Sequence, residues 1–398
     1  MDNYLIRVIP LIAFLLIFYV SYKRKNKIAI SIISVYLVSS LSSLFITQDD
    51  LPFHNFSTDS IFYVLLYTLI HSFFLSLTLF LKPFLDIHQL PKGKIYSWMV
   101  IVFSIGALFS IIYLTPYAMI SLGKSAYEVR TSLSGEYGLP VSYLTTIAVG
   151  LPSFYYVYSF MLYVALIKGN KLNAIFAGIG ILSFVINVLT VSGRDGIFLA
   201  SYSLVIGYFC FEPLLRIKLK KQIKKYFFII LTLGLIPIVK ITIDRFSESD
   251  GLTFTAFKKG IINYLGMQPF IFSDWLKENK LFHGGANNFS LFTNMKLLDY
   301  TEPYTWSFGT YLASFYSISG YLSLVYVSLL FYFIFKHFVK NLYNYSTISI
   351  FFFYSFFLHF MISGVFYFRL GTPGGNLFMV ISLIMILLLK KIDVKKIR

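Results

Sequence analysis

Apolar runs about as long as a bilayer is thick recur along almost the whole chain, separated by short charged clusters. A helix needs roughly 20 predominantly apolar residues to cross the hydrocarbon core. These runs predict an all-α polytopic membrane protein, with residues 1–398 forming a single transmembrane domain. We expect about eleven transmembrane helices, at about 4–22, 28–46, 60–81, 95–114, 141–167, 172–191, 197–211, 226–243, 310–335, 343–367 and 374–389.

The charges are divided unequally between the two faces that these spans define. The chain has a net charge of +17. If the 23–27 connection is inside, the inner segments hold 22 Lys and Arg against three acids, and the outer segments hold 12 against 14. This positive-inside bias places the amino terminus outside and the carboxyl terminus inside. The basic charge is thereby explained, and nucleic acid is not expected as a partner.

One inner segment is especially basic. Residues 216–225 contain Arg216, Lys218, Lys220, Lys221, Lys224 and Lys225. We interpret this segment as a topology determinant, and the alternative is a basic amphipathic stretch that lies on anionic head groups.

Two outer segments contain residue types that bind polar substrates. The first, 115–140, includes Tyr127, Glu128 and Arg130, and Tyr127 and Arg130 share a face if 125–133 is helical. The alternative is an exposed loop with solvated charges.

The second outer segment, 244–309, is the longest connection, and it alternates aromatic with charged residues. We expect an ordered cap over a cavity, with short helices over 253–265 and 269–279 whose aromatic side chains lie at head-group depth. At its far end, Gly309 and Gly320 favour close helix packing over a simple helix start.

A five-residue polar tip, Ser192-Gly193-Arg194-Asp195-Gly196, joins two apolar runs and is also outside. With it, four arginines from separate parts of the chain lie on the outer face: Arg130, Arg194, Arg245 and Arg369. A guanidinium stays charged and offers a planar fork to phosphate oxygens, so converging arginines suit a lipid diphosphate. The alternative is that each arginine contacts head groups or pairs with a neighbouring acid.

Candidates for a general base are also outside, among them Glu128, Asp195, Asp244, Glu248 and His283. The six histidines show no HExxH motif and no clustered ligand spacing, so no metal is expected. His71 and His359 lie within spans, where we expect them to bond neighbouring helices. No Walker loop, dinucleotide fingerprint or Gly-x-Ser-x-Gly elbow is present.

The polar tip, the long outer segment and Trp306-Ser307-Phe308-Gly309 resemble the Wzy family, the bacterial polymerases of O-antigen, capsule and related oligosaccharide repeat units. The resemblance implies a metal-independent glycosyltransferase with a GT-C-like fold in the bacterial cytoplasmic membrane. Such an enzyme needs no cofactor and transfers the growing glycan from undecaprenyl diphosphate to the next lipid-linked repeat unit. A chain-length regulator protein would be a further partner.

On this resemblance, we expect Arg194 and Arg245 to contact the diphosphate, and Arg130 and Arg369 to make secondary phosphate or sugar contacts. Glu128, Asp195 or His283 would activate the acceptor hydroxyl. Tyr127, Trp275 and Trp306 would contact sugar rings. Lipid tails would enter laterally between helices.

Two other functions remain open. An O-antigen ligase shares the same chemistry and differs mainly in its acceptor. A flippase or other glycan transporter is a separate class, which commonly shows internal repeats and charges at the bilayer midplane. No clear repeat is present here, and the notable charges lie at the outer surface.

Overall fold

The structure is a computed structural model. It describes residues 4–47, 60–124, 139–140, 142–191, 193, 195–226, 239, 242, 258–277, 288–289, 291, 309–341 and 345–389. Within these residues the secondary structure is helical, apart from one isolated bridge between Thr310 and Tyr367. The chain forms two compact units, here called unit 1 (1–82, 254–341 and 359–372) and unit 2 (83–253, 342–358 and 373–398).

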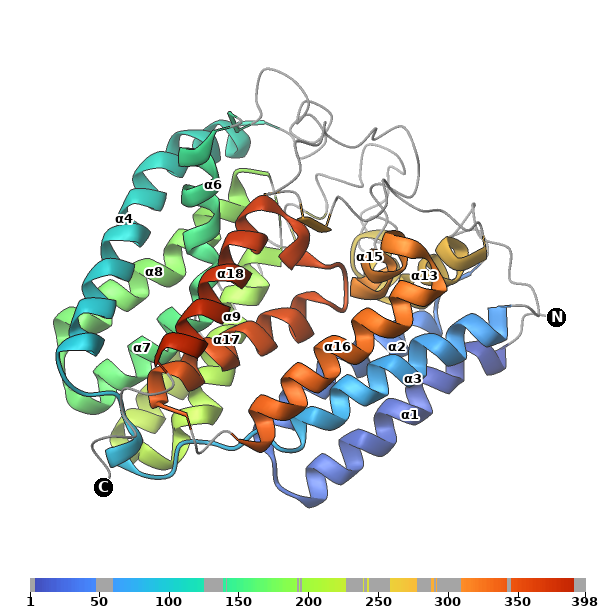
Figure 1. The fold of residues 1–398 in the computed structure, drawn as a ribbon, viewed down its shortest axis with the longest axis horizontal. Coiled ribbons are helices and arrows are strands. Elements are labelled where there is room, and N and C mark those ends of the chain that lie inside the picture. The colour runs from blue at the N-terminus through green and yellow to red at the C-terminus, as the bar shows by residue number, and fades with distance from the viewer. Residues whose placement is uncertain are drawn as a thin grey trace. The chain divides into compact units, whose positions relative to one another are not determined.

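Unit 1 contains four long or medium helices and several shorter ones. Its elements are α1 (Tyr4–Lys23), α2 (Lys27–Ser43), α3 (Ser60–Thr78), the π-helical η5 (Lys258–Asn263), α12 (Tyr264–Gly266), α13 (Gln268–Lys277), α15 (Thr310–Ser319), α16 (Tyr321–Lys340), the end of α17 (Thr347–Ser363) and η8 (Arg369–Gly371). Helix α3 packs against both α1 and α16, and these helices run side by side in Figure 1.

One asparagine holds together the turn between α1 and α2 and the end of α3. The Asn26 side-chain oxygen accepts a hydrogen bond from the Ala29 N–H at 3.1 Å and so caps α2. Its amide nitrogen donates to the carbonyl of Leu81 at 3.0 Å and to that of Leu79 at 3.3 Å. This contact fixes α3 antiparallel to α2.

Unit 2 is built around α7. Its elements are η2 (Ile87–Gln89), α4 (Lys94–Leu122), α6 (Tyr143–Gly150), η3 (Leu151–Phe154), α7 (Tyr155–Lys168), α8 (Lys171–Leu189), α9 (Asp195–Phe211), η4 (Glu212–Leu214), a helical stretch over 217–226, most of α17, and α18 (Pro373–Leu388).

Nearly all of α7 is buried between neighbouring helices, so polar atoms on it need partners inside the unit. The Tyr158 hydroxyl donates to the Phe103 carbonyl at 3.1 Å, and the Tyr163 hydroxyl donates to the Leu204 carbonyl at 2.7 Å. These bonds tie α7 to α4 and α9.

Among the described residues, six helices are long and apolar enough to cross a membrane. They are Ile61–Thr78, Lys94–Leu122, Tyr143–Lys168, Lys171–Leu189, Asp195–Leu214 and Tyr321–Lys340. An all-helical chain with these helices fits a polytopic membrane protein. The count of eleven spans and the GT-C-like architecture stay predictions, and most of the expected span at 226–243 lies outside the described residues.

The run expected to be one span at 310–335 is instead two helices, α15 and α16, separated by Gly320. Gly320 has φ +73° and ψ −145°, a conformation that is essentially restricted to glycine. A helix of ten residues is about 15 Å long and cannot cross a bilayer. The close packing expected at Gly320 is therefore wrong, because this glycine turns the chain.

Ser323 stabilises that turn. Its hydroxyl donates to the Phe315 carbonyl at 2.8 Å and accepts from the Ser319 N–H at 2.9 Å. The close packing expected at Gly309 is present, since a Cβ there would lie 3.4 Å from the backbone of Phe272 in α13.

Candidate functional site

The structure describes three of the expected site residues: Asp195, Trp275 and Arg369. The other seven lie outside the described residues: Tyr127, Glu128, Arg130, Arg194, Arg245, His283 and Trp306. Their expected roles stay predictions.

Asp195 belongs to the polar tip, is the first residue of α9 and is partly buried. A carboxylate in the first turn of a helix is stabilised by the unpaired N–H groups there. The tip is tight: a Cβ on Gly193 would lie 2.9 Å from the Asp195 carboxylate, and Cβ atoms on Gly193 or Gly196 would both collide with Val188. Two glycines thus bring the start of α9 onto the end of α8.

Arg369 begins the short helical turn η8 and is partly buried. Its guanidinium carbon lies 6.0 Å from the centre of the Tyr367 ring, within the range of a cation–π contact. The Thr372 hydroxyl donates to the Arg369 carbonyl at 3.0 Å, which closes the turn. The arginine is therefore held on an ordered turn.

This turn is attached to the start of α15 by backbone bonds. The Thr310 N–H donates to the Phe366 carbonyl at 3.0 Å, and the Tyr311 N–H donates to the Gly364 carbonyl at 3.2 Å. Thr310 has φ +62°, which is a strained conformation for a β-branched residue. The strain lies where the Trp306-Ser307-Phe308-Gly309 segment enters α15, and surrounding contacts must hold it.

Trp275 lies on α13, a helix close to the one expected over 269–279. Its ring is only 8% exposed and packs with Ile271 and with Ala313 of α15. Phe270 and Phe272 of the same helix are also buried. The aromatic side chains of α13 therefore face the protein interior instead of projecting outward.

Arg7 is a further arginine that the sequence patterns did not single out, because it lies inside the first apolar run. It is 5% exposed. Its Nη1 donates to the Leu44 carbonyl at 3.4 Å, and its guanidinium carbon lies 5.9 Å from the centre of the Phe270 ring. Arg7 thus connects α1, the end of α2 and α13. We call this region the Arg7 end of unit 1.

The same end includes the other short elements of unit 1. The Ser39 hydroxyl donates to the Leu265 carbonyl at 2.7 Å, and a Cβ on Gly266 would lie 2.5 Å from the Ser42 carbonyl carbon. The Tyr264 and Phe366 rings are 5.3 Å apart. Helix α12 therefore packs against α2, and the ring of Phe366, before Arg369, packs against the start of α12.

A buried cluster of polar aromatic side chains lies in the core of unit 1. His71 donates from Nδ1 to the Tyr67 carbonyl of its own helix at 2.9 Å, and its Nε2 is buried without a hydrogen-bond partner. Its ring lies 5.4 Å from that of Tyr36 and 4.9 Å from that of Tyr311. His71 therefore contacts neighbouring helices through its ring, and the expected hydrogen bond to another helix is not formed.

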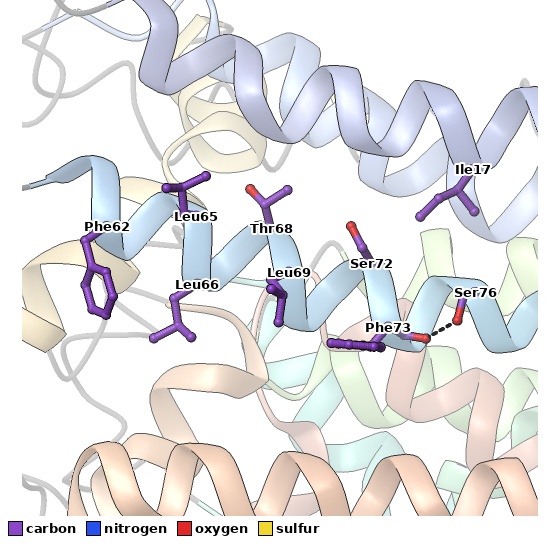
Figure 2. A pocket seen from close by; sticks show the side chains of 9 residues that line it. All are labelled: Ile17, Phe62, Leu65, Leu66, Thr68, Leu69, Ser72, Phe73 and Ser76. Atoms are coloured by element: carbon purple, nitrogen blue, oxygen red, sulfur yellow. Dashed lines mark hydrogen bonds between the residues drawn. The ribbon is translucent and has the colours of Figure 1, made fainter.

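A pocket of about 780 Å³ runs along α3. We call it the α3 pocket. Figure 2 shows Ile17 extending from α1 toward α3, which supplies the other lining residues, from Phe62 to Ser76. Apolar side chains dominate the lining, and the Ser76 hydroxyl is turned back to the Phe73 carbonyl at 2.6 Å. The pocket suits an apolar chain.

No group of three or more His, Cys, Asp or Glu side chains within the described ranges is arranged to hold a metal ion. No protein family, curated protein or solved structure matches the chain.

Proposed function

We propose that this protein is a metal-independent glycosyltransferase of the bacterial cytoplasmic membrane that polymerises lipid-linked oligosaccharide repeat units. The observation that carries the proposal is that four arginines from separate parts of the chain, Arg130, Arg194, Arg245 and Arg369, fall in segments predicted to lie on the outer face. Arg369 supports it further, because it is held on an ordered turn at a helix end. In this topology the amino terminus is outside and the carboxyl terminus is inside.

The donor is the growing glycan on undecaprenyl diphosphate, and the acceptor is the next lipid-linked repeat unit. A hydroxyl oxygen of the acceptor forms a bond to the anomeric carbon of the donor. The bond from that carbon to the diphosphate oxygen breaks, and the diphosphate leaves with the electron pair. The leaving group is already activated, so no nucleotide is consumed.

The arginines stabilise the charge that develops on the departing diphosphate. Arg194 and Arg245 contact its oxygens, and Arg130 and Arg369 make secondary phosphate or sugar contacts. Glu128, Asp195 or His283 accepts the proton of the attacking hydroxyl. The sugars are positioned by Tyr127, Trp275 and Trp306. Trp275 does so indirectly, because its buried ring packs α13 against α15.

The α3 pocket is the proposed path for a polyprenyl tail. Phe62 and Ser76 are fourteen residues apart on one helix, which corresponds to about 21 Å along its axis. That length covers most of the roughly 30 Å hydrocarbon core. Apolar side chains predominate along this length, which suits an isoprenoid chain.

Reconstitution with a single substrate tests the proposal. The purified protein in vesicles is supplied with lipid-linked repeat units alone, and the products are separated by size. A ladder of lengthening glycans is expected. Transfer only after lipid A core is added would instead identify a ligase, and movement of the lipid-linked sugar across the membrane without a new glycosidic bond would identify a transporter.

A further inference from the structure

A second pocket, of about 320 Å³, lies in unit 2, and none of its lining residues is among those placed in the transfer reaction. Its polar side chains include Lys168, Arg216 and Lys218, and Leu166, Leu214 and Leu219 are among its apolar ones. We call it the basic pocket. Among the residues that the structure describes, no carboxylate and no aromatic side chain lines it.

The basic pocket is formed where several helices end. Lys168 is the last residue of α7, and Gly169 ends that helix in the left-handed conformation. Leu214 ends η4, directly after α9, and 217–226 is the helical stretch that contains the basic segment seen in the sequence. A pocket at the ends of spans lies at the membrane surface, and its basic residues belong to the face assigned as inner.

One cation of the pocket, Lys168, is held in place by the fold. The Lys168 ammonium donates to the Pro91 carbonyl at 2.6 Å and lies 5.2 Å from the centre of the Tyr96 ring. The segment before Pro91 is in turn tied to α9, because the Phe84 N–H donates to the Cys210 carbonyl at 2.8 Å. Lys168 is thereby fixed beside Arg216 and the helical stretch that begins after it and contains Lys218.

Three like charges around one small cavity repel each other, and Lys92 adds further repulsion on Lys168. With no carboxylate in the lining, a bound anion would offset this repulsion. Arginine and lysine together suit a phosphate, arginine as a planar fork and lysine as a point charge.

The rest of the lining indicates what carries the phosphate. The leucine side chains continue the pocket as an apolar surface, which is unsuited to free phosphate. The lining offers no aromatic ring on which a base could stack. An aliphatic chain attached to the phosphate satisfies both parts of the pocket.

We propose that the basic pocket binds an anionic phospholipid of the inner leaflet, with its phosphate between Lys168, Arg216 and Lys218 and its acyl chain along Leu166, Leu214 and Leu219. Basic pockets between membrane helices on the cytoplasmic side bind anionic head groups in this way. The pocket is large enough for the head group and the first part of a chain, and the remainder of the lipid stays in the bilayer.

Titration of delipidated full-length protein with phosphatidylglycerol, followed by native mass spectrometry, tests the site. Each cation near an anionic head group strengthens binding about fivefold, so Arg216→Gln with Lys218→Gln is expected to weaken phosphatidylglycerol binding about 25-fold. The matched control is Lys224→Gln with Lys225→Gln, which removes the same number of positive charges at the far end of the adjoining helical stretch, outside the pocket. The control is expected to bind like the wild type.

Two further tests use the wild-type protein and so do not depend on the folding of a variant. Phosphatidylcholine is expected to bind at least tenfold more weakly than phosphatidylglycerol, and millimolar inorganic phosphate is expected not to displace the bound lipid. Equal loss of binding in the two double variants would overturn the proposal, because it would reveal a diffuse basic surface. Displacement by inorganic phosphate, or equal binding of phosphatidylcholine, would overturn it as well.

Discussion

The guanidinium of Arg7 lies against the ring of Phe270, with 5.9 Å between its carbon and the ring centre. Arg7 belongs to the first helix of the chain and Phe270 to α13, which are separated by more than 260 positions in the sequence. The contact therefore fixes α13, a helix of the long connecting segment, onto α1 and the end of α2. This segment is the one expected from the sequence to form an ordered cap over a cavity.

Arg7→Ala is expected to destabilise the protein by about 1–3 kcal/mol, because it removes a desolvated cation–π contact and leaves its packing space empty. Thermal unfolding of the purified protein in detergent measures the effect. Arg24→Ala is the control, since Arg24 is exposed in the turn after α1. Equal unfolding temperatures for the two variants would show that Arg7 does not hold α13.

Gly320→Ala is expected to cost about 1–3 kcal/mol, because a Cβ is strained at φ +73° and ψ −145°. The space around Gly320 is open, since an added Cβ would lie 3.9 Å from the nearest atom, in the Tyr316 ring, so the loss would reflect backbone conformation and not a collision. The same unfolding measurement applies. An alanine variant as stable as the wild type would mean that α15 and α16 are one continuous helix.

Gly180→Ala is expected to destabilise unit 2 by about 1–3 kcal/mol, because the added methyl group would overlap the buried ring of Tyr158. Gly178 is on the same helix and has no atom within 4 Å of an added Cβ. Gly178→Ala should therefore leave stability unchanged or raise it by up to about 1 kcal/mol through helix propensity. A reversed order of the two variants would contradict the packing of α7 against α8.

Much of the helical layout could be predicted from the sequence. Apolar runs near 4–22, 172–191 and 374–389 correspond to α1, α8 and α18 within a few residues. The break at Gly320 could not be predicted. Hydropathy stays high through it, and amino-acid composition does not reveal the φ and ψ angles of a single glycine. The burial of α13 was also missed, since an amphipathic aromatic helix has the same sequence pattern whether its aromatic face contacts lipid head groups or the protein interior.

The site was predictable only in outline. Residue type and topology pointed to Asp195 and Arg369, and the structure places both at helix starts or turns. Arg7 was missed because a single arginine inside an apolar run resembles an interfacial residue until its contacts with Leu44 and Phe270 are known. Tertiary packing decides that distinction.

Arg369→Ala and Arg369→Lys are expected to slow chain growth, since neither keeps the planar fork proposed to contact phosphate or sugar. Because its contacts are secondary, we expect a loss of about tenfold, below the roughly 100-fold or more for a group that stabilises the leaving charge directly. Initial rates of glycan extension in vesicles measure this, with Arg24→Lys as the control. An unchanged rate for Arg369→Ala would remove Arg369 from the site.

The most direct test of the central claim counts undecaprenyl diphosphate released per glycosidic bond formed, with purified protein, lipid-linked repeat units and EDTA. We predict one molecule released per bond, and a loss of at least about 100-fold in both Arg194→Lys and Arg194→Ala at unchanged protein levels. Bond formation without release of the lipid diphosphate, or full activity of either Arg194 variant, would contradict the account.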